Sequence, residues 1–279
     1  MKKLLLIILC LPINYCSCEG EKKENDLTKY NIKGKVNEIT ETKYNAKESF
    51  GDFQKTDLIS KDKYKYDENG NKTELSRYNK DGDLRDKVKF KYDKDGNITE
   101  DSWYFKDGDL DSKAKYKYDE NGNQTELSYY NEDGSFDSKD KYKYDENGNK
   151  TELNRYNKDG DLRDKVKFKY DKDGNITERS SYNKDGDLDS KHKYKRDKDG
   201  NCTEDSWYNK YGDLRFKYKF KYDKDGNKTE ESYYNKDGDL DTKLKYKYEY
   251  DYNNNWIVSK EYYNDSPYTI KEREIKYYE

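Results

Sequence analysis

The chain has few of the side chains on which most enzyme active sites depend. Its 279 residues include one histidine and four cysteines. His192 occupies a position of an internal repeat that is filled elsewhere by Val88, Ala114 or Asp140, so a base and nucleophile pair built on it would be accidental. Carboxylates are abundant, but none stands in an apolar setting that would tune a general acid. The sequence predicts no catalytic residues, no metal site and no cofactor.

Apolar residues are also scarce. Only 30% of the chain is hydrophobic and 43% is charged, which would indicate disorder without the 33 tyrosines. Disordered segments are poor in aromatic residues, so we expect a folded chain with a thin layer of Tyr and Phe. The 58 basic and 61 acidic residues are interleaved. Because no basic stripe emerges, we expect no nucleic-acid partner.

The amino-terminal segment, MKKLLLIILCLPINYCSC, has the layout of a secretory signal and is too short for a membrane-spanning helix. It resembles a bacterial lipoprotein signal, in which cleavage precedes an acylated cysteine. Cys18 after Ser17 fits that pattern better than Cys16 after the bulky Tyr15. We therefore expect a signal over residues 1–17, a tether over 18–27, and a lipid anchor in the outer membrane or at the cell surface. An ordinary cleaved signal with incidental cysteines is the alternative.

Few cysteines would remain after such cleavage. With Cys18 as the first residue, Cys202 is the only other thiol, so no intramolecular disulfide is expected despite an oxidising compartment. Cys202 fills a repeat position occupied elsewhere by Ile98, Ile176 or Lys228. We interpret it as a small strand residue, with a reactive thiol as the alternative.

Glycine marks a repeat of 26 residues. Two glycine series share this spacing: Gly70, Gly96, Gly122, Gly148, Gly174, Gly200 and Gly226, and Gly82, Gly108, Gly134, Gly160, Gly186, Gly212 and Gly238. Each unit has two turns, written ENGN or DKDGN and then NKDGD, with alternating residues between them. Asn-Gly and Asp-Gly between such runs predict hairpins with type I′ turns. Seven double-hairpin units cover residues 63–244.

The two kinds of turn predict a consistent register. Two-residue loops at Asn69-Gly70 and Asp81-Gly82 predict the pairs Tyr66–Thr73, Lys65–Glu74, Tyr64–Leu75, Glu74–Lys89, Leu75–Val88 and Thr73–Phe90. These pairs place aromatic and aliphatic residues on one face and alternate Lys with Glu on the other. Because a one-residue slip would mix the faces, the agreement favours a continuous antiparallel meander.

The flanks of the array read as terminal caps, which repeat proteins require. Residues 28–62 predict amino-terminal cap strands, and residues 245–279 predict carboxy-terminal cap strands in which asparagine replaces a turn glycine. The fold class is all-β, with about 18 strands and essentially no helix after the signal. Accumulated twist predicts a curved or spiralled single sheet with the aromatic face inside. A flat, freestanding layer is the competing arrangement.

The repeated phrases KYDENGN, YDKDGNIT and KYDKDGNKTE resemble the YD repeats of the bacterial Rhs family. Matching positions include Tyr66-Asp67 with Gly70, Tyr92-Asp93 with Gly96, and Tyr170-Asp171 with Gly174. The resemblance implies hairpins in long spiralling sheets, which in that family can close into shells around toxin cargo. No toxin-like domain follows the array here, so encapsulation is not expected. The whole design is more similar to small envelope lipoproteins with such repeats.

Two candidate binding features remain. Trp103, Tyr129, Trp207 and Tyr233 share one repeat position on the aromatic side, and a row of rings there suits sugars or extended peptides. Edge packing of the curled sheet is the alternative. The Asp-rich turns are similar to calcium loops, but an EF-hand alignment fails at both essential ends, with Lys91 at its first position and Ser102 at its last. Tight hairpins require the same residues.

The sequence thus predicts a membrane-anchored envelope lipoprotein that displays a non-catalytic β-repeat array as a structural or ligand-binding module, with a glycan or protein as its ligand. The first alternative is a periplasmic immunity or cargo-holding partner of a toxin. A weak calcium-binding repeat protein is a more remote alternative.

Overall fold

The computed structural model describes residues 25–49 and 52–279, which form one antiparallel β-sheet and one short helix. The predicted signal and the candidate lipidation residues Cys16 and Cys18 lie outside the described residues. The elements are α1 Asp26–Lys29, β1 Val36–Ser49, β2 Asp52–Tyr66, β3 Lys72–Tyr78, β4 Leu84–Tyr92, β5 Ile98–Phe105, β6 Leu110–Tyr118, β7 Gln124–Asn131, β8 Phe136–Tyr144, β9 Lys150–Tyr156, β10 Leu162–Tyr170, β11 Ile176–Asn183, β12 Leu188–Arg196, β13 Cys202–Asn209, β14 Leu214–Tyr222, β15 Lys228–Tyr234, β16 Leu240–Tyr250, β17 Trp256–Tyr263 and β18 Ser266–Tyr277. No helix among them is long and apolar enough to cross a membrane.

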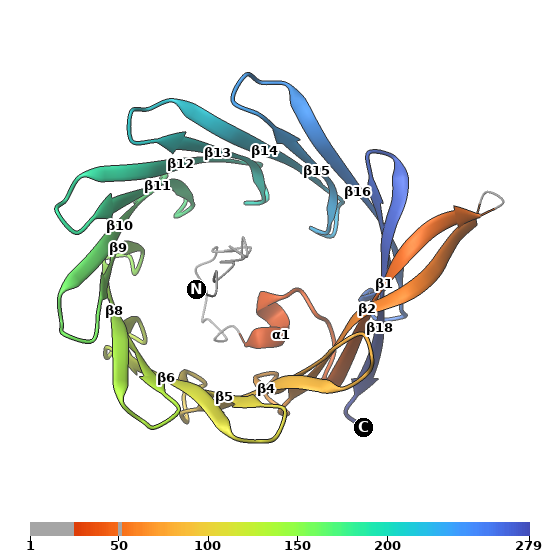
Figure 1. Cartoon of the computed structure of the whole chain (residues 1–279), viewed down its shortest axis with the longest axis horizontal. Coiled ribbons are helices and arrows are strands. Elements are labelled where there is room, and N and C mark those ends of the chain that lie inside the picture. Colours follow the sequence, from red (N-terminus) through yellow and green to blue (C-terminus); the bar gives the residue numbers. More distant parts are fainter. Residues whose placement is uncertain (1–24, 50–51) are drawn as a thin grey trace.

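The sheet closes into a ring of 18 strands (Figure 1). Each strand pairs with its neighbours in the chain, and β1 also pairs with β18, from Val36–Tyr277 to Asn45–Thr269. The predicted all-β meander is confirmed, and its curvature proceeds to complete closure. Closure removes the two free edges that a flat layer would expose to other chains.

The repeat turns differ from the predicted type I′ geometry. In the first turn, Asp67 N donates to Asn71 O (2.9 Å) and Gly70 N donates to Asp67 O (3.0 Å). The left-handed conformation falls on Gly70 alone, with φ 83°, as in a type I turn closed by a glycine bulge. This geometry prevails because Asp67 Oδ1 accepts the backbone N–H groups of Asn69 and Asn71, each at 2.9 Å.

The strand register is nevertheless largely as predicted. The predicted pairs that form are Lys65–Glu74, Tyr64–Leu75, Glu74–Lys89 and Leu75–Val88. Next to the turn, Tyr66 faces Lys72 instead of Thr73, because Thr73 is an extra, bulged residue. The longer loop and this bulge shift the register by one residue in opposite senses, so they cancel. The predicted pair Thr73–Phe90 lies beyond the end of the β3–β4 ladder.

The structure gives the Tyr-Asp dipeptide two separate roles. The aspartate builds the turn, as Asp67 does. The tyrosine hydroxyl donates to a backbone carbonyl of the preceding strand, for example from Tyr118 to Ile98 O (2.8 Å) and from Tyr170 to Lys150 O (2.7 Å). This bond gives a carbonyl at the start of a strand a hydrogen-bond donor, which a backbone carbonyl away from water requires.

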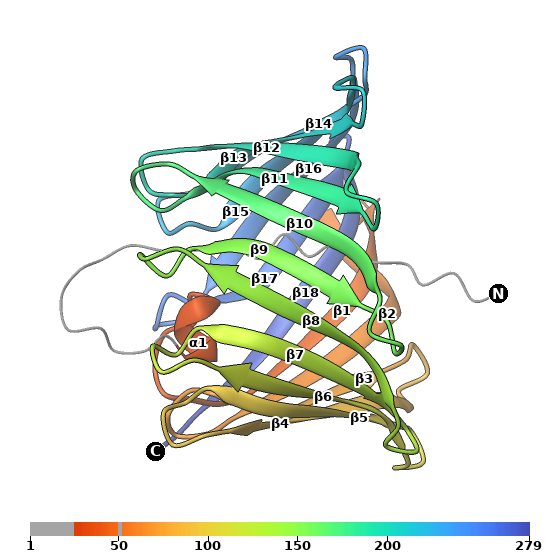
Figure 2. The ribbon, with the colours of Figure 1, turned by 90° about the vertical axis from the view of Figure 1, so that its left-hand side faces the viewer.

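Residues 25–35 occupy one mouth of the barrel, which we call the α1 end (Figures 1 and 2). The side chain of Asn25 caps α1 by accepting from Thr28 N (2.9 Å). Asp26 Oδ2 accepts from Lys72 N and from the Tyr92 hydroxyl, both at 2.8 Å. Leu27 N also donates to Gly70 O (3.2 Å). These bonds hold α1 against the turn between β2 and β3.

The same segment crosses part of the mouth. Asn31 Nδ2 donates to Asp225 O in the turn between β14 and β15 (2.9 Å), and Lys33 N donates to Asn255 Oδ1 (2.8 Å). Its apolar residues form a small core with the first two strands, comprising Leu27, Ile32, Val36, Ile39 and Tyr66. The segment is therefore part of the folded barrel.

Alanine in place of two turn glycines should separate backbone strain from docking of this segment. Gly160→Ala should lower the free energy of unfolding by about 1 kcal/mol, because its φ of 88° strains an L-residue. Gly70→Ala should cost more, since at a similar φ its Cβ would lie 2.5 Å from Asn25 Nδ2, whereas Gly160 has nothing within 4 Å. Urea unfolding followed by circular dichroism gives both values.

Asparagine provides the control for this comparison. Asn254 holds φ 59° at the equivalent turn position between β16 and β17, so Gly160→Asn should cost less than Gly160→Ala. Equal costs for the two alanine variants would contradict a stabilising contact between Asn25 and the β2–β3 turn.

Candidate functional site: the aromatic lumen

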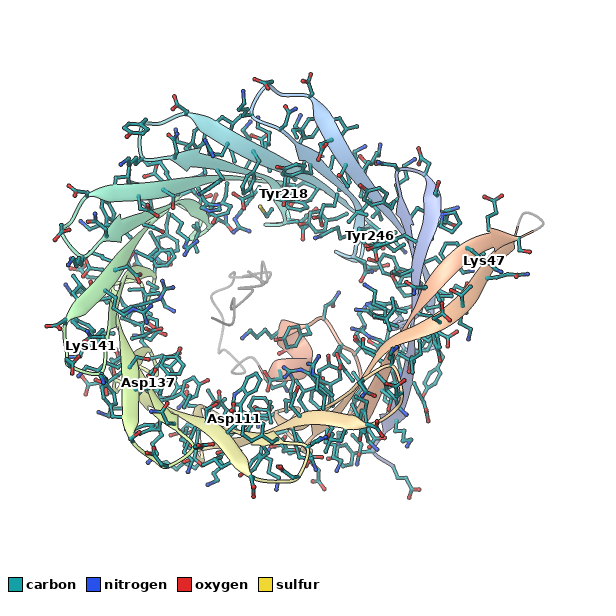
Figure 3. All side chains as sticks on the ribbon, in the orientation of Figure 1. Lys47, Asp111, Asp137, Lys141, Tyr218 and Tyr246 are labelled. Carbon is teal, nitrogen blue, oxygen red and sulfur yellow. The ribbon has the colours of Figure 1, made fainter. Side chains whose placement is uncertain are left out.

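The two faces of the closed sheet carry different side chains: lysine–glutamate ladders and repeat tyrosines such as Tyr104, which pairs with Lys87, lie on one face, and other rings with some charge pairs lie on the other. Figure 3 shows Tyr218 and Tyr246 pointing into the ring and Lys141 pointing away from it. Cross-strand partners share a face of a sheet, so the register assigns the other strand residues to the same two faces. We call the enclosed space the lumen. The described side chains line its wall and leave the centre of the ring unfilled (Figure 3), in keeping with the wide interior of barrels of this strand number.

The outer wall carries ladders of ion pairs. In β5, Glu100 contacts Lys91 of β4 at 2.9 Å and Lys113 of β6 at 3.6 Å. The same arrangement recurs around Glu152, whose partners are Lys143 (2.9 Å) and Lys165 (3.6 Å). Strand surfaces that face lipid are apolar. Such rows of charge therefore suit a wall in contact with water.

Glu152 shows the balance of forces in a ladder. Burial opposes its ionisation, but a hydrogen bond from Asn154 Nδ2 (2.7 Å) and the two lysines outweigh burial and lower its pKa to about 2. Its side chain is 13% exposed. The carboxylate is therefore more stable in the folded state than in the unfolded chain, and the ladder contributes to folding at neutral pH.

Glu152→Gln should lower the free energy of unfolding at pH 7 by about 1 kcal/mol, because the charge lost is only partly screened by water. A lowered folded-state pKa gives stability above the unfolded value of 4.5 that is lost as pH falls through about 2. The difference between the two proteins should therefore shrink over that window in urea unfolding. Glu146→Gln, at an exposed turn of the same unit, is the control. A deficit that does not change with pH would refute this account.

The predicted row of rings lies on the lumen wall but is divided between two sectors. Trp103 in β5 is 36% exposed, and the Arg77 guanidinium lies 4.9 Å from its ring centre. Tyr129 in β7 has its hydroxyl 3.5 Å from Asp140 Oδ2. The strands between this sector and β13 carry Arg155 and Ser181 at the same position, so the four rings form no continuous surface.

The other half of the row belongs to a larger group of rings. Trp207 of β13 lies 4.8 Å from Phe216 of β14, and Tyr233 of β15 lies 5.2 Å from Tyr218 and 5.8 Å from Phe216. We call Trp207, Phe216, Tyr218 and Tyr233 the aromatic cluster. All four are partly exposed. The row did not include Phe216 and Tyr218, although their departure from the repeat was visible in the sequence.

Paired charges line other parts of the lumen. Arg77 Nη1 donates to Asp86 Oδ1 (2.8 Å), and Arg155 Nη1 donates to Asp164 Oδ1 (2.8 Å). These identical pairs lie on β3–β4 and β9–β10. The lumen is therefore lined by ion pairs in some sectors and by clustered rings in another, which suits selective binding of a ligand with distinct polar and apolar parts.

His192 and Cys202 lie on the strands bordering the cluster. His192 Nδ1 is 2.9 Å from Asp205 Oδ1, and its ring is 6.3 Å from that of Trp207. Cys202, at the start of β13, lies across from Arg196, and its thiol is 3.4 Å from Glu204 O. Both are strand residues at repeat positions that other units fill with different residues.

The turn carboxylates are engaged in backbone hydrogen bonds. Asp93 Oδ1 accepts from Asp95 N (2.9 Å) and Asn97 N (2.8 Å). Over residues 25–49 and 52–279, no group of three or more His, Cys, Asp or Glu residues is placed to hold a metal ion. Aspartate, the same residue type that calcium loops use, thus forms the backbone hydrogen bonds of a tight turn at these positions.

No protein-family model matches the chain, and no curated protein matches it. Among solved structures, a porin-like protein from Bacteroides uniformis is similar over 86% of this chain and 98% of its own, with 9% identity and a TM-score of 0.45. A TcdB2-TccC3 structure without its hypervariable C-terminal region matches 75% of this chain and 14% of its own, with 11% identity and a TM-score of 0.31.

A putative outer membrane lipoprotein-sorting protein domain from Vibrio parahaemolyticus is similar over 89% of this chain and 88% of its own, with 9% identity and a TM-score of 0.25. All three TM-scores are below 0.5. The resemblance to YD repeats therefore stays an interpretation of the sequence.

Proposed function

We propose that this chain is an exported envelope protein, anchored through a lipid on Cys18, whose barrel holds a ligand in its lumen without transforming it. The observation that carries the proposal is the separation of faces. Ion-pair ladders cover the outer wall, while partly exposed rings such as Trp103 and Trp207 line the inner wall. These rings stay partly exposed, at a cost in apolar burial.

A lipid anchor is consistent with this arrangement. The charged outer wall offers little apolar area for membrane contact, so a membrane location would depend on the amino-terminal segment. The signal-like sequence and Cys18 provide such an anchor. The alternative role, as a partner that holds or neutralises a toxin, uses the same lumen with a polypeptide as ligand.

The anchor is tested by replacing the cysteines separately. Cys18→Ser should abolish metabolic palmitate labelling and move the protein from the membrane to the soluble envelope fraction, because no other acylation site follows the predicted cleavage. Cys202→Ser should leave labelling and fractionation unchanged. Label retained by Cys18→Ser, or absent from the natural protein, would contradict anchoring at Cys18.

Occupancy of the lumen is tested with two neighbouring residues of β14 that point to opposite faces. Native mass spectrometry of protein purified from its own envelope should show a bound mass that Phe216→Asp reduces, because it puts a charge among the lumen rings. Aspartate already fills this repeat position at Asp86 and Asp164, so folding should be kept. Lys217→Gln, on the outer wall, should retain the mass.

Two outcomes of the same experiment would contradict the proposal. A mass that both variants retain equally would place the ligand outside the lumen, and no retained mass in any of the three proteins would count against a ligand-holding role.

A further inference from the structure

One hairpin departs from the repeat at three positions, each time to an aromatic residue. The β13–β14 hairpin has Tyr211 at its turn, where the other six units have aspartate. It has Phe216 where they have Asp, Ser or Thr, and Tyr218 where they have Val, Ala, Asp, His or Leu. Tyr211 is 77% exposed. Since the other hairpins form the same fold without these rings, closure of the barrel does not require them.

The rings of the aromatic cluster are inclined to one another. The interplanar angles are 37° for Trp207 and Phe216, 45° for Phe216 and Tyr233, 50° for Tyr218 and Tyr233, and 77° for Phe216 and Tyr218. Such rings provide no flat shelf for stacking a sugar or a base. They offer several ring faces at different angles, and each face carries the negative end of the ring quadrupole.

Rings elsewhere on the lumen wall are already covered by cations of the chain. The Arg77 guanidinium lies 4.9 Å from the ring centre of Trp103, and Lys150 Nζ lies 4.2 Å from that of Tyr142. Among the described residues, no lysine or arginine lies over Trp207, Phe216 or Tyr233. Trp207, Phe216 and Tyr233 therefore offer ring faces of the kind that this chain elsewhere pairs with positive charge.

Carboxylates border the cluster. Asp205 lies across from Tyr218, and Glu231 lies across from Phe220. Asp205 is hydrogen-bonded to His192 (2.9 Å), and Glu231 pairs with Lys228 (2.8 Å), whose ammonium also lies 4.7 Å from the Phe220 ring centre. Each bordering carboxylate is thus paired with a basic side chain of the chain itself.

We propose that the aromatic cluster binds an organic ammonium cation, with Trp207, Phe216 and Tyr233 around the charge and Asp205 and Glu231 as bordering carboxylates. The proposal rests on the lumen-binding role above and names its ligand class. Quaternary ammonium groups are bound by inclined aromatic rings through cation–π attraction. An extended peptide is less well suited, because all strands of the closed wall are paired and no edge remains to add a strand.

The first test compares two probes of equal shape. Choline and its uncharged analogue 3,3-dimethylbutan-1-ol are titrated into the purified full-length protein by calorimetry and followed by tryptophan fluorescence. Choline should bind about tenfold or more tightly, because only its charge distinguishes it from the analogue. Equal affinities, or no binding of choline at millimolar concentration, would overturn the proposal.

The second test uses substitutions for which the chain supplies its own templates. Trp207→Ser introduces the residue that Ser181 places at the same repeat position, and Tyr211→Asp restores the aspartate that the other six units have at that turn. Trp207→Ser should weaken choline binding about tenfold, as removal of a central aromatic contact does, while Tyr211→Asp, at an exposed turn outside the cluster, should leave it unchanged. Equal effects of the two variants would refute the assignment to the cluster.

A double variant guards against misfolding of a single one. Phe216→Ser with Tyr218→Ala reproduces on β14 the lumen residues Ser112 and Ala114, which already lie across from Trp103 and Asp101. It should fold, as checked by circular dichroism, and lose choline binding. If native mass spectrometry finds a lumen-dependent ligand that is not an ammonium compound, this inference fails and the proposed function stands. If neither a retained mass nor choline binding is found, both fail.

Discussion

Each hairpin of the repeat array turns through a left-handed glycine, and this local geometry decides which side chains face the lumen. The three-residue loop would place every following residue on the wrong face if it acted alone. The bulge at Thr73 and its equivalents reverses the shift, so Lys65 still faces Glu74. Because side chains alternate with a period of two, an error of one residue in any turn would put the charged ladders inside and the rings outside.

Separation of faces has different energetic consequences on the two walls. Outside, ladder glutamates such as Glu100 and Glu152 are shared by lysines of both neighbouring strands, and many pairs of modest individual value accumulate around the ring. Inside, rings are only partly buried, so their apolar area contributes less to folding than a filled core would. The barrel therefore depends on hydrogen bonds and charge pairing more than on a dense core. The exception is the small core that residues 25–35 form with β1 and β2.

The site was predictable only in part. The shared repeat position of Trp103, Tyr129, Trp207 and Tyr233 is visible in the sequence, and the structure does place all four on the lumen wall. Whether such rings contact one another depends on the residues across from them. Trp103 faces Ser112 and is covered by an arginine, whereas Trp207 faces Phe216 and joins a cluster. A search for positions that the units share does not single out Phe216 and Tyr218, because these two residues occur in one unit only. A comparison of where the units differ would have located them.

The sequence by itself determined the number of strands, the parity of their faces and the positions of the turns, because these follow from alternation and from glycines that local geometry requires. It did not determine the turn type, since the preference of Asp67 for two backbone N–H groups competes with the Asn-Gly signal. Only the tertiary structure decided that the sheet closes. Closure joins Val36 to Tyr277. Pairing of the two terminal strands depends on the summed twist and stagger of all the others, and no local stretch of sequence carries that sum.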